Sequence, residues 1–226
     1  MELVVYDTPA DVAVGAATRI ADAISSATDR FSLGLAGGTT PVATYEALRG
    51  RATGWDRVDA WLSDERWVGP EDERSNGRMA AQSLMDHVSA RFDRPRWSEF
   101  MEPEDSAAHY EARLRSIHHE RRPDIILLGM GEDAHTASLF PGSEALEETR
   151  RWFVASEIPQ TREPRLTATY PLLWASTTLM VITAGESKAR ALRDSIEDGG
   201  TPVARIMEGE ATVEWHVDRA AASLLS

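Results

Sequence analysis

The sequence predicts an α/β fold, specifically a three-layer α/β/α sandwich around a mostly parallel sheet. Short runs of β-forming residues alternate with helical patterns along the chain, which is typical of parallel strands joined by crossover helices. Several of these runs are apolar throughout, as strands covered on both faces are. No repeat, low-complexity block or Gly/Ser linker separates two halves, so we expect one domain over residues 1–226.

In the first half of the chain, uninterrupted apolar runs predict strands, and alanine-rich or amphipathic spacing predicts helices. Pro9 to Ser26 is an alanine-rich helical pattern. Thr40 is expected to be an N-cap with Pro41 at the first helical position, which would begin a helix over 42–48. The expected strands are 3–6, 31–36 and 58–62, and residues 76–90 and 104–120 are expected to be helical.

In the second half, 124–128 is almost wholly apolar and is expected to be a buried strand. Further strands are expected at 152–156, 178–183 and 212–216, with a helix over 186–196. In such sheets ligands bind beyond the carboxyl ends of the strands. Polar clusters follow three of the expected strands, at 37–41, 63–66 and 129–138, so the sequence predicts a site at that edge.

Composition excludes several classes of function. The chain has 24 basic and 37 acidic residues, a net charge of −13 and no cysteine. The absence of cysteine excludes disulfides, thiolate zinc sites and a cysteine nucleophile, and an acidic chain is a poor ligand for nucleic acid. The start of the chain carries Asp7 and Asp11 without a basic segment before an apolar stretch, and no run could span a bilayer. We therefore expect a cytoplasmic protein with no membrane contact.

The first cluster, Gly37-Gly38-Thr39-Thr40-Pro41, predicts an anion site. Two glycines allow a tight turn and a close approach of backbone to ligand. The helix that follows directs free N–H groups and the positive end of its dipole at the turn, which suits a phosphate or carboxylate. The alternative is an ordinary tight turn with a Thr-Pro cap.

The second cluster, Ser63-Asp64-Glu65-Arg66, directly follows a strand. It could supply an acid–base carboxylate together with a guanidinium for an oxyanion or phosphate. The alternative is a solvated loop with an internal ion pair.

The third cluster carries His135 on a glycine-rich polar loop, flanked by Asp133, Thr136 and Ser138. Because free imidazole titrates near pH ~6.5, a histidine in such a loop can act as a general base near neutral pH. A surface histidine without a role is the alternative. The spacing of Gly129, Gly131 and Ala134 also fits a dinucleotide fingerprint, but Pro141 ends the segment too early for the long helix that this motif must open.

A single lysine, Lys188, stands at the start of the helix expected after strand 178–183. There its ammonium group could meet an anion held by the first loop, although it could also be an exposed helix residue. No histidine pair has the i, i+4 spacing with a carboxylate that a zinc site needs, so no metal is expected.

Taken together, these motifs resemble the 6-phosphogluconolactonase family, within the broader glucosamine-6-phosphate deaminase superfamily. The resemblance covers nearly the whole chain and rests on motifs in matching order: 36–41, 64–68 with Ser75-Asn76, 129–141, 165–167 with Pro171, and Gly185 with Lys188. It implies a Rossmann-like fold and hydrolysis of 6-phosphoglucono-δ-lactone in the oxidative pentose phosphate pathway, without metal or organic cofactor. Family members usually have glycine where Ala134 stands, a difference that matters if that position needs a positive φ.

The resemblance also implies roles for individual residues. His135 would activate water, and Asp64 would orient sugar hydroxyls or that water. The candidate catalytic residues are His135, Asp64 and Asp133, and the candidate substrate- and phosphate-binding residues are Gly37, Gly38, Thr39, Thr40, Arg66, Arg165 and Lys188.

Two other functions stay open on the sequence alone. An amino-sugar phosphate deaminase-isomerase would share the fold and the phosphate loop, and a non-catalytic sugar-phosphate sensor would use the loops for binding only. The expected partner is a small phosphorylated sugar lactone, with the protein a monomer or a small homo-oligomer.

Overall fold

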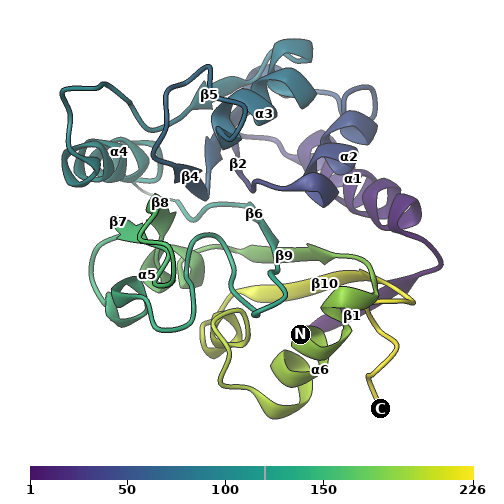
Figure 1. The fold of residues 1–226 in the computed structure, drawn as a ribbon. Coiled ribbons are helices and arrows are strands. Elements are labelled where there is room, and N and C mark those ends of the chain that lie inside the picture. Colours follow the sequence, from purple (N-terminus) through teal and green to yellow (C-terminus); the bar gives the residue numbers. More distant parts are fainter. Residues whose placement is uncertain (120) are drawn as a thin grey trace.

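In the computed structural model, which describes residues 1–119 and 121–226, seven strands form one sheet in which every neighbouring pair runs parallel (Figure 1). Leu33 stands opposite Ile125, and Ile126 opposite Leu179, which fixes the register of the three central strands. The prediction of an α/β fold with a mostly parallel sheet is confirmed. Across the sheet the strands are β1 (Glu2–Tyr6), β10 (Thr212–Asp218), β9 (Thr178–Thr183), β6 (Ile125–Gly129), β2 (Phe31–Leu35), β3 (Val58–Leu62) and β5 (Arg91–Asp93).

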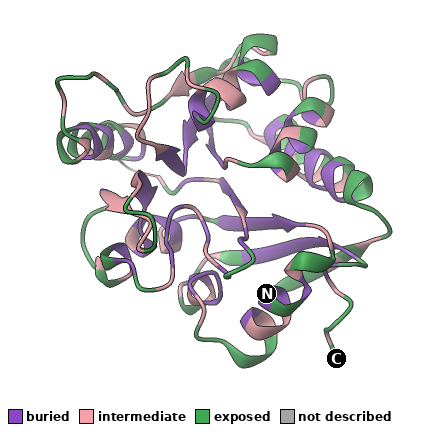
Figure 2. Ribbon diagram, in the orientation of Figure 1, coloured by how far each residue is buried: buried purple, intermediate pink, exposed green. Residues whose placement is uncertain are grey.

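The two faces of this sheet carry separate hydrophobic cores because side chains alternate along each strand. In β6, Ile125 and Leu127 face the core beneath α1 (Pro9–Ser26) and α2 (Thr39–Leu48). Ile126 and Leu128 face the opposite core, which includes residues of α4 (Pro103–Ile117) and α6 (Ala189–Arg193). The inner strands are therefore buried, whereas the edge strands β1 and β5 are partly exposed and the outer surfaces of the helices are exposed (Figure 2), as in a three-layer sandwich.

A second, antiparallel sheet was not expected. It consists of β4 (Asp64–Arg66), β8 (Pro164–Ala168) and β7 (Phe153–Glu157), in that order. The strand expected at 152–156 therefore exists, but it belongs to this small sheet. The polar cluster 63–66, for which a solvated loop was one interpretation, is mostly strand. Periodicity could not show this, because β4 is three residues long and pairs with residues about one hundred positions away.

Three predicted helices differ from the structure. The helix expected over 76–90 ends early: α3 spans Asn76–Ser83, and the chain continues through a 3₁₀ turn into edge strand β5. The helix expected over 186–196 is divided into a 3₁₀ turn at Glu186–Lys188, α6 and a π-helical turn at Asp194–Asp198. The helix expected over 104–120 is α4, and its predicted end at residue 120 lies outside the described residues.

A short helix, α5 (Tyr170–Trp174), follows β8 and was also not predicted. Among the described residues, no helix is long and apolar enough to cross a membrane.

Candidate active site

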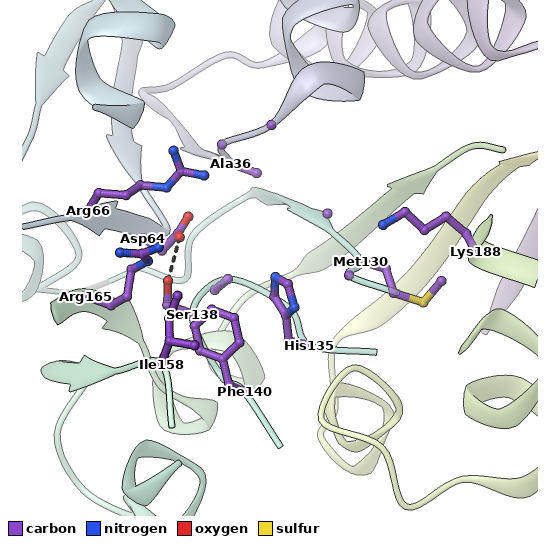
Figure 3. Close-up of a pocket in the computed structure, with 15 residues that line it drawn as sticks. Ala36, Asp64, Arg66, Met130, His135, Ser138, Phe140, Ile158, Arg165 and Lys188 are labelled. Atoms are coloured by element: carbon purple, nitrogen blue, oxygen red, sulfur yellow. Dashed lines mark hydrogen bonds between the residues drawn. The ribbon is translucent and has the colours of Figure 1, made fainter. Parts of the chain in front are cut away.

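A pocket of about 340 Å³ opens at the carboxyl ends of the central strands (Figure 3). It lies where the strand order reverses: after β2 the chain continues to β3 on one side, whereas after β6 it continues to β9 on the other. Such a switch point is where ligands bind in open α/β sheets. The pocket is lined by Ala36, Gly37, Gly38, Asp64, Arg66, Gly129, Met130, Gly131, His135, Ala137, Ser138, Phe140, Ile158, Arg165 and Lys188.

The turn after β2 brings backbone amides to this pocket. A Cβ on Gly37 would lie 2.1 Å from Asn76 Oδ1, and Gly38 has a φ of 109°, so both positions require glycine. The prediction of Thr40 as N-cap is wrong, because α2 begins at Thr39 with Gly38 as its N-cap. The first amides of α2 have no acceptor within the helix and point toward its N-terminal end. Thr39 and Thr40 lie at this end of the helix but are not among the residues that line the pocket.

Strand β4 sends alternate side chains in opposite directions. Asp64 and Arg66 line the pocket, whereas Glu65 points to the N-terminus of α3. There the Glu65 carboxylate accepts hydrogen bonds from the amides of Asn76 (2.6 Å) and Gly77 (2.7 Å) and from the Ser75 hydroxyl (3.0 Å). Burial raises the pKa of Glu65, and these hydrogen bonds offset only part of that effect. Glu65 is therefore a helix-capping residue outside the pocket.

Asp64 is held rigidly at the pocket wall. Its Oδ2 accepts a hydrogen bond from Ser138 Oγ at 2.8 Å, the dashed line in Figure 3, and its Oδ1 accepts one from Asn76 Nδ2 at 3.1 Å. Asp64 is buried, with 7% of its surface exposed. These two hydrogen bonds fix the orientation of the Asp64 carboxylate at the pocket wall.

The loop after β6 is fixed by its own hydrogen bonds. The amide of Gly131 donates to the carbonyl of His135 at 2.9 Å, and the Thr136 hydroxyl donates to the carbonyl of Gly129 at 2.9 Å. Ala134 and Ala137 adopt positive φ angles of 61° and 48°, a region that costs alanine about 1–2 kcal/mol. Such strain persists only where the surroundings determine the conformation, so the backbone that carries His135 is set before any ligand arrives.

His135 and Asp133 form a hydrogen-bonded pair at the pocket wall. Asp133 Oδ1 lies 2.6 Å from His135 Nδ1, and an ionised carboxylate can only accept, so Nδ1 carries the proton and Nε2 has the free lone pair. Partial burial works to raise the pKa of Asp133, but its close pairing with His135 outweighs burial and lowers that pKa. A Cβ on Gly131 would lie 2.1 Å from His135 Nδ1, so glycine leaves room for this pair.

Cations stand at two sides of the pocket. Arg66 and Arg165 come from the paired strands β4 and β8, and Lys188 comes from the turn after β9 (Figure 3). Gly185, which begins that turn, has a φ of 98°. Within residues 1–119 and 121–226, no carboxylate forms an ion pair with Lys188, so its charge is available to a ligand.

The structure brings together most of the residues singled out in the sequence. The pocket is lined by Gly37, Gly38, Asp64, Arg66, His135, Arg165 and Lys188. Asp133 is hydrogen-bonded to the imidazole without lining the pocket, and Thr39 and Thr40, at the N-terminus of α2, do not line it.

Other lining residues were missed. Phe140 packs against the His135 ring with 4.4 Å between ring centroids, and Ile158 extends from the β7–β8 hairpin. Asn76, which orients Asp64, was quoted only as part of a motif. An apolar residue on a hairpin gives no sequence signal of its own, because the hairpin is placed by a pairing that the sequence pattern did not reveal. No group of three or more His, Cys, Asp or Glu side chains suited to a metal ion is found in the described part of the chain.

The fold and this pocket define an α/β protein with a cation-lined pocket at the switch point of its sheet. A family model described as glucosamine-6-phosphate isomerases/6-phosphogluconolactonase matches residues 7–215. The chain belongs to this family.

Individual relatives show how far the likeness extends. The chain is 34% identical over 208 residues to a 6-phosphogluconolactonase of a Nostoc species, covering 87% of this chain and 85% of the relative. A crystal structure of a 6-phosphogluconolactonase from Shewanella baltica superposes with a TM-score of 0.86 and 27% identity, covering 96% of this chain and 97% of that one. A monomeric glucosamine-6-phosphate deaminase has the same fold, with a TM-score of 0.83, 23% identity, and coverage of 99% and 100%.

Proposed function

We propose that this protein hydrolyses 6-phosphogluconolactone to 6-phosphogluconate, using water activated by His135. The observation that carries the proposal is the state of the His135 ring. Its Nδ1 is bound to Asp133, which leaves Nε2 free on a ring that shares its pocket with three cationic side chains. The names of the relatives described above agree with this reaction.

The proposed chemistry needs one base and no covalent nucleophile. Water oxygen attacks C1 of the lactone as Nε2 takes a proton from the water, and the carbonyl electrons move to oxygen. When the tetrahedral intermediate collapses, the bond between C1 and the ring oxygen breaks, and the imidazolium returns the proton to that oxygen. Asp133 stabilises the imidazolium and holds the ring, as a carboxylate does in a catalytic triad. A positioned base is typically worth about 10²–10⁴-fold in rate.

The Ser138 hydroxyl is unsuited to act as a nucleophile. A nucleophilic serine gives its proton to a histidine, whereas Ser138 Oγ donates to the carboxylate of Asp64 at 2.8 Å. This hydrogen bond supports direct attack by water and leaves Asp64 as an acceptor for sugar hydroxyls.

The phosphate group is assigned to the N-terminus of α2 and to Lys188. Gly38, Thr39 and Thr40 offer amide and hydroxyl donors there, with the positive end of the helix dipole behind them. Arg66 and Arg165 would serve a second negative group, either the phosphate itself or the charge that develops at C1. Local cations of this kind offset the repulsion expected from a chain with a net charge of −13.

A spectrophotometric assay with freshly generated 6-phosphogluconolactone tests the proposal. After dialysis against EDTA, the enzyme should accelerate ring opening well above the spontaneous rate measured in the same buffer. A rate equal to the spontaneous rate would overturn the proposal. Release of ammonia from glucosamine 6-phosphate, run in parallel, reports the deaminase activity that the shared fold also permits.

We further propose that the chain works as one domain, since the pocket takes its walls from residues between 36 and 188. A phosphorylated substrate does not cross a bilayer unaided, which favours a cytoplasmic location. For the oligomeric state we predict a monomer or a small homo-oligomer, and light scattering on the purified protein would test this prediction.

A further inference from the structure

The two arginines of the pocket face each other across a strand pair. Arg66 of β4 and Arg165 of β8 are directly opposed in the antiparallel register, and both side chains reach the pocket (Figure 3). Like charges in directly opposed positions repel each other, and Arg165 is largely buried, with 9% of its side chain exposed. A negatively charged group is therefore needed to hold the two guanidinium groups next to each other.

Glu163, one residue before β8, supplies the nearest carboxylate. Its Oε2 accepts a hydrogen bond from Arg165 Nη2 at 3.0 Å, and Arg165 Nη1 donates to the carbonyl of Pro164 at 3.2 Å. These two contacts fix one edge of the guanidinium and leave its other N–H groups for the pocket. Glu163 itself is not among the residues that line the pocket.

Arg74, on the loop before α3, joins this arrangement from outside. Its Nη1 donates to Glu163 Oε1 at 3.3 Å, and its backbone carbonyl accepts a hydrogen bond from Arg66 Nη1 at 2.7 Å. Asp72 holds the Arg74 guanidinium at 3.1 and 3.0 Å, and that hydrogen-bonded pairing lowers the pKa of Asp72 to about 2. Arg74 thus contacts Glu163 through its side chain and Arg66 through its backbone carbonyl.

Three arginines and two carboxylates form this cluster, and the carboxylate of Asp64 lines the same pocket as Arg66 and Arg165. Arg66, Arg74 and Arg165 carry three positive charges, and Asp72 and Glu163 carry two negative ones. The hydrogen bond and charge of Arg165, with the charges of Arg74 and Arg66, hold the pKa of Glu163 below its ordinary value, so the carboxylate stays ionised at neutral pH.

We propose that Glu163 is a positioning residue for substrate binding, acting through Arg165 and braced by Arg74. Without its carboxylate, the Arg165 guanidinium keeps, among the described residues, only the contact to its neighbour Pro164 and is repelled by Arg66. The inference rests on the proposed function, because it is read out through binding of the phosphorylated lactone.

The central experiment is a double-mutant cycle in the full-length protein with Glu163→Gln, Arg165→Gln and both together. Glu163→Gln is expected to raise KM for 6-phosphogluconolactone about five- to tenfold, with kcat within about twofold, because Arg165 becomes less ordered while His135 is untouched. In the Arg165→Gln background, Glu163→Gln should change KM by less than about twofold. Glu163→Asp, which keeps the charge, should recover part of the loss.

Two further variants separate positioning from general effects on the hairpin. Glu157→Gln removes another ion pair of the β7–β8 hairpin, that with Arg162, and should leave KM unchanged. Arg74→Gln should raise KM less than Glu163→Gln, since the Arg74 side chain is 60% exposed and exposed pairs contribute little. The Arg66 contact to the Arg74 backbone survives that substitution.

The KM values of these variants decide whether Glu163 positions Arg165. An unchanged or lower KM in Glu163→Gln would overturn the proposal, and so would a KM effect that persists in full without Arg165. An equal rise in Glu157→Gln would assign the effect to hairpin stability and overturn it as well. A wild-type protein that does not hydrolyse the lactone would contradict the proposed function itself. An active wild type together with an unchanged KM in Glu163→Gln would contradict only the role given to Glu163.

Discussion

His118 and His135 both carry a ring proton on Nδ1, but His118 is buried whereas His135 is accessible from the pocket. His118 Nδ1 donates to the carbonyl of Leu114 at 2.8 Å, and Ser32 Oγ lies 2.6 Å from its Nε2. Because Ser32 Oγ also accepts the indole N–H of Trp61 at 2.9 Å, its own proton points to the imidazole. Every hydrogen-bonding atom of this ring is used, and His118 is 4% exposed.

His135 differs in one nitrogen. Its Nδ1 is bound to Asp133, but Nε2 is free, and 31% of its side chain is exposed at the pocket. A serine–histidine contact alone therefore does not make a catalytic site, since the pair at Ser32 and His118 is closed on all sides. What distinguishes the candidate base is an unused lone pair with access to a ligand.

The sharpest test of this comparison exchanges the two histidines for alanine. His135→Ala should lower the rate of lactone hydrolysis about 10²–10⁴-fold and change the free energy of unfolding by less than about 1 kcal/mol. His118→Ala should instead lower the free energy of unfolding by about 2–4 kcal/mol, because it leaves a cavity and an unsatisfied Ser32 hydroxyl. It should leave kcat nearly unchanged. Progress curves and urea unfolding measure both, and near-normal turnover by His135→Ala would refute its role as base.

The next largest effect concerns the free cation of the pocket. Lys188→Ala should raise KM for the phosphorylated lactone about 10- to 100-fold, the worth of a charge-assisted hydrogen bond, and should hardly affect hydrolysis of unphosphorylated gluconolactone. Arg190→Ala, which removes an exposed cation two residues away, is the matched control and should leave both substrates unaffected. Equal losses on both substrates would show that Lys188 does not contact the phosphate.

Local sequence patterns foresaw the parts of the site that follow strands of the parallel sheet. The glycines at 37 and 38, His135 and Lys188 lie in the segments that follow β2, β6 and β9, and parallel strands bring their carboxyl ends to one edge. The condition under which alanine at position 134 was expected to matter does hold, because Ala134 has a φ of 61°.

The parts that sequence patterns missed depend on distant pairing. Arg165 was named as a candidate residue, but the pairing of β8 with β4 that brings it to the pocket was not predicted, and Glu163 and Ile158 belong to the same hairpin. Three-residue β4 has too few residues for a period to be visible, and its charged residues suggest a loop. The tautomer of His135 and the helix-capping role of Glu65 likewise appear only when the side-chain contacts are known.

The pH dependence of stability extends the comparison to the buried histidine. Burial lowers the pKa of His118, so the unfolded chain binds its proton at a higher pH than the folded protein does. The contribution of His118 is fully present above about pH 6.5 and is lost as the pH falls below that value. The loss is at most about 1.4 kcal/mol per pH unit. Urea unfolding between pH 8 and pH 5 should therefore show a smaller decline in His118→Gln than in wild type, and parallel curves would contradict the assignment.

The smallest expected effect concerns the backbone next to the candidate base. Ala134→Gly relieves the positive φ, worth about 1–2 kcal/mol, but it removes a methyl group worth about 0.8 kcal/mol when buried and makes the unfolded chain more flexible by about 0.4–1 kcal/mol. These terms nearly cancel, so the free energy of unfolding should change by less than about 1 kcal/mol. The loop should keep its geometry because its hydrogen bonds, such as that from the Val203 amide to the Ala134 carbonyl at 3.0 Å, do not involve the methyl group. Unchanged kcat and KM would show that the contacts of the loop, and not the residue at position 134, orient His135. A loss of kcat beyond about tenfold at unchanged stability would show that the alanine methyl group itself helps to hold the ring.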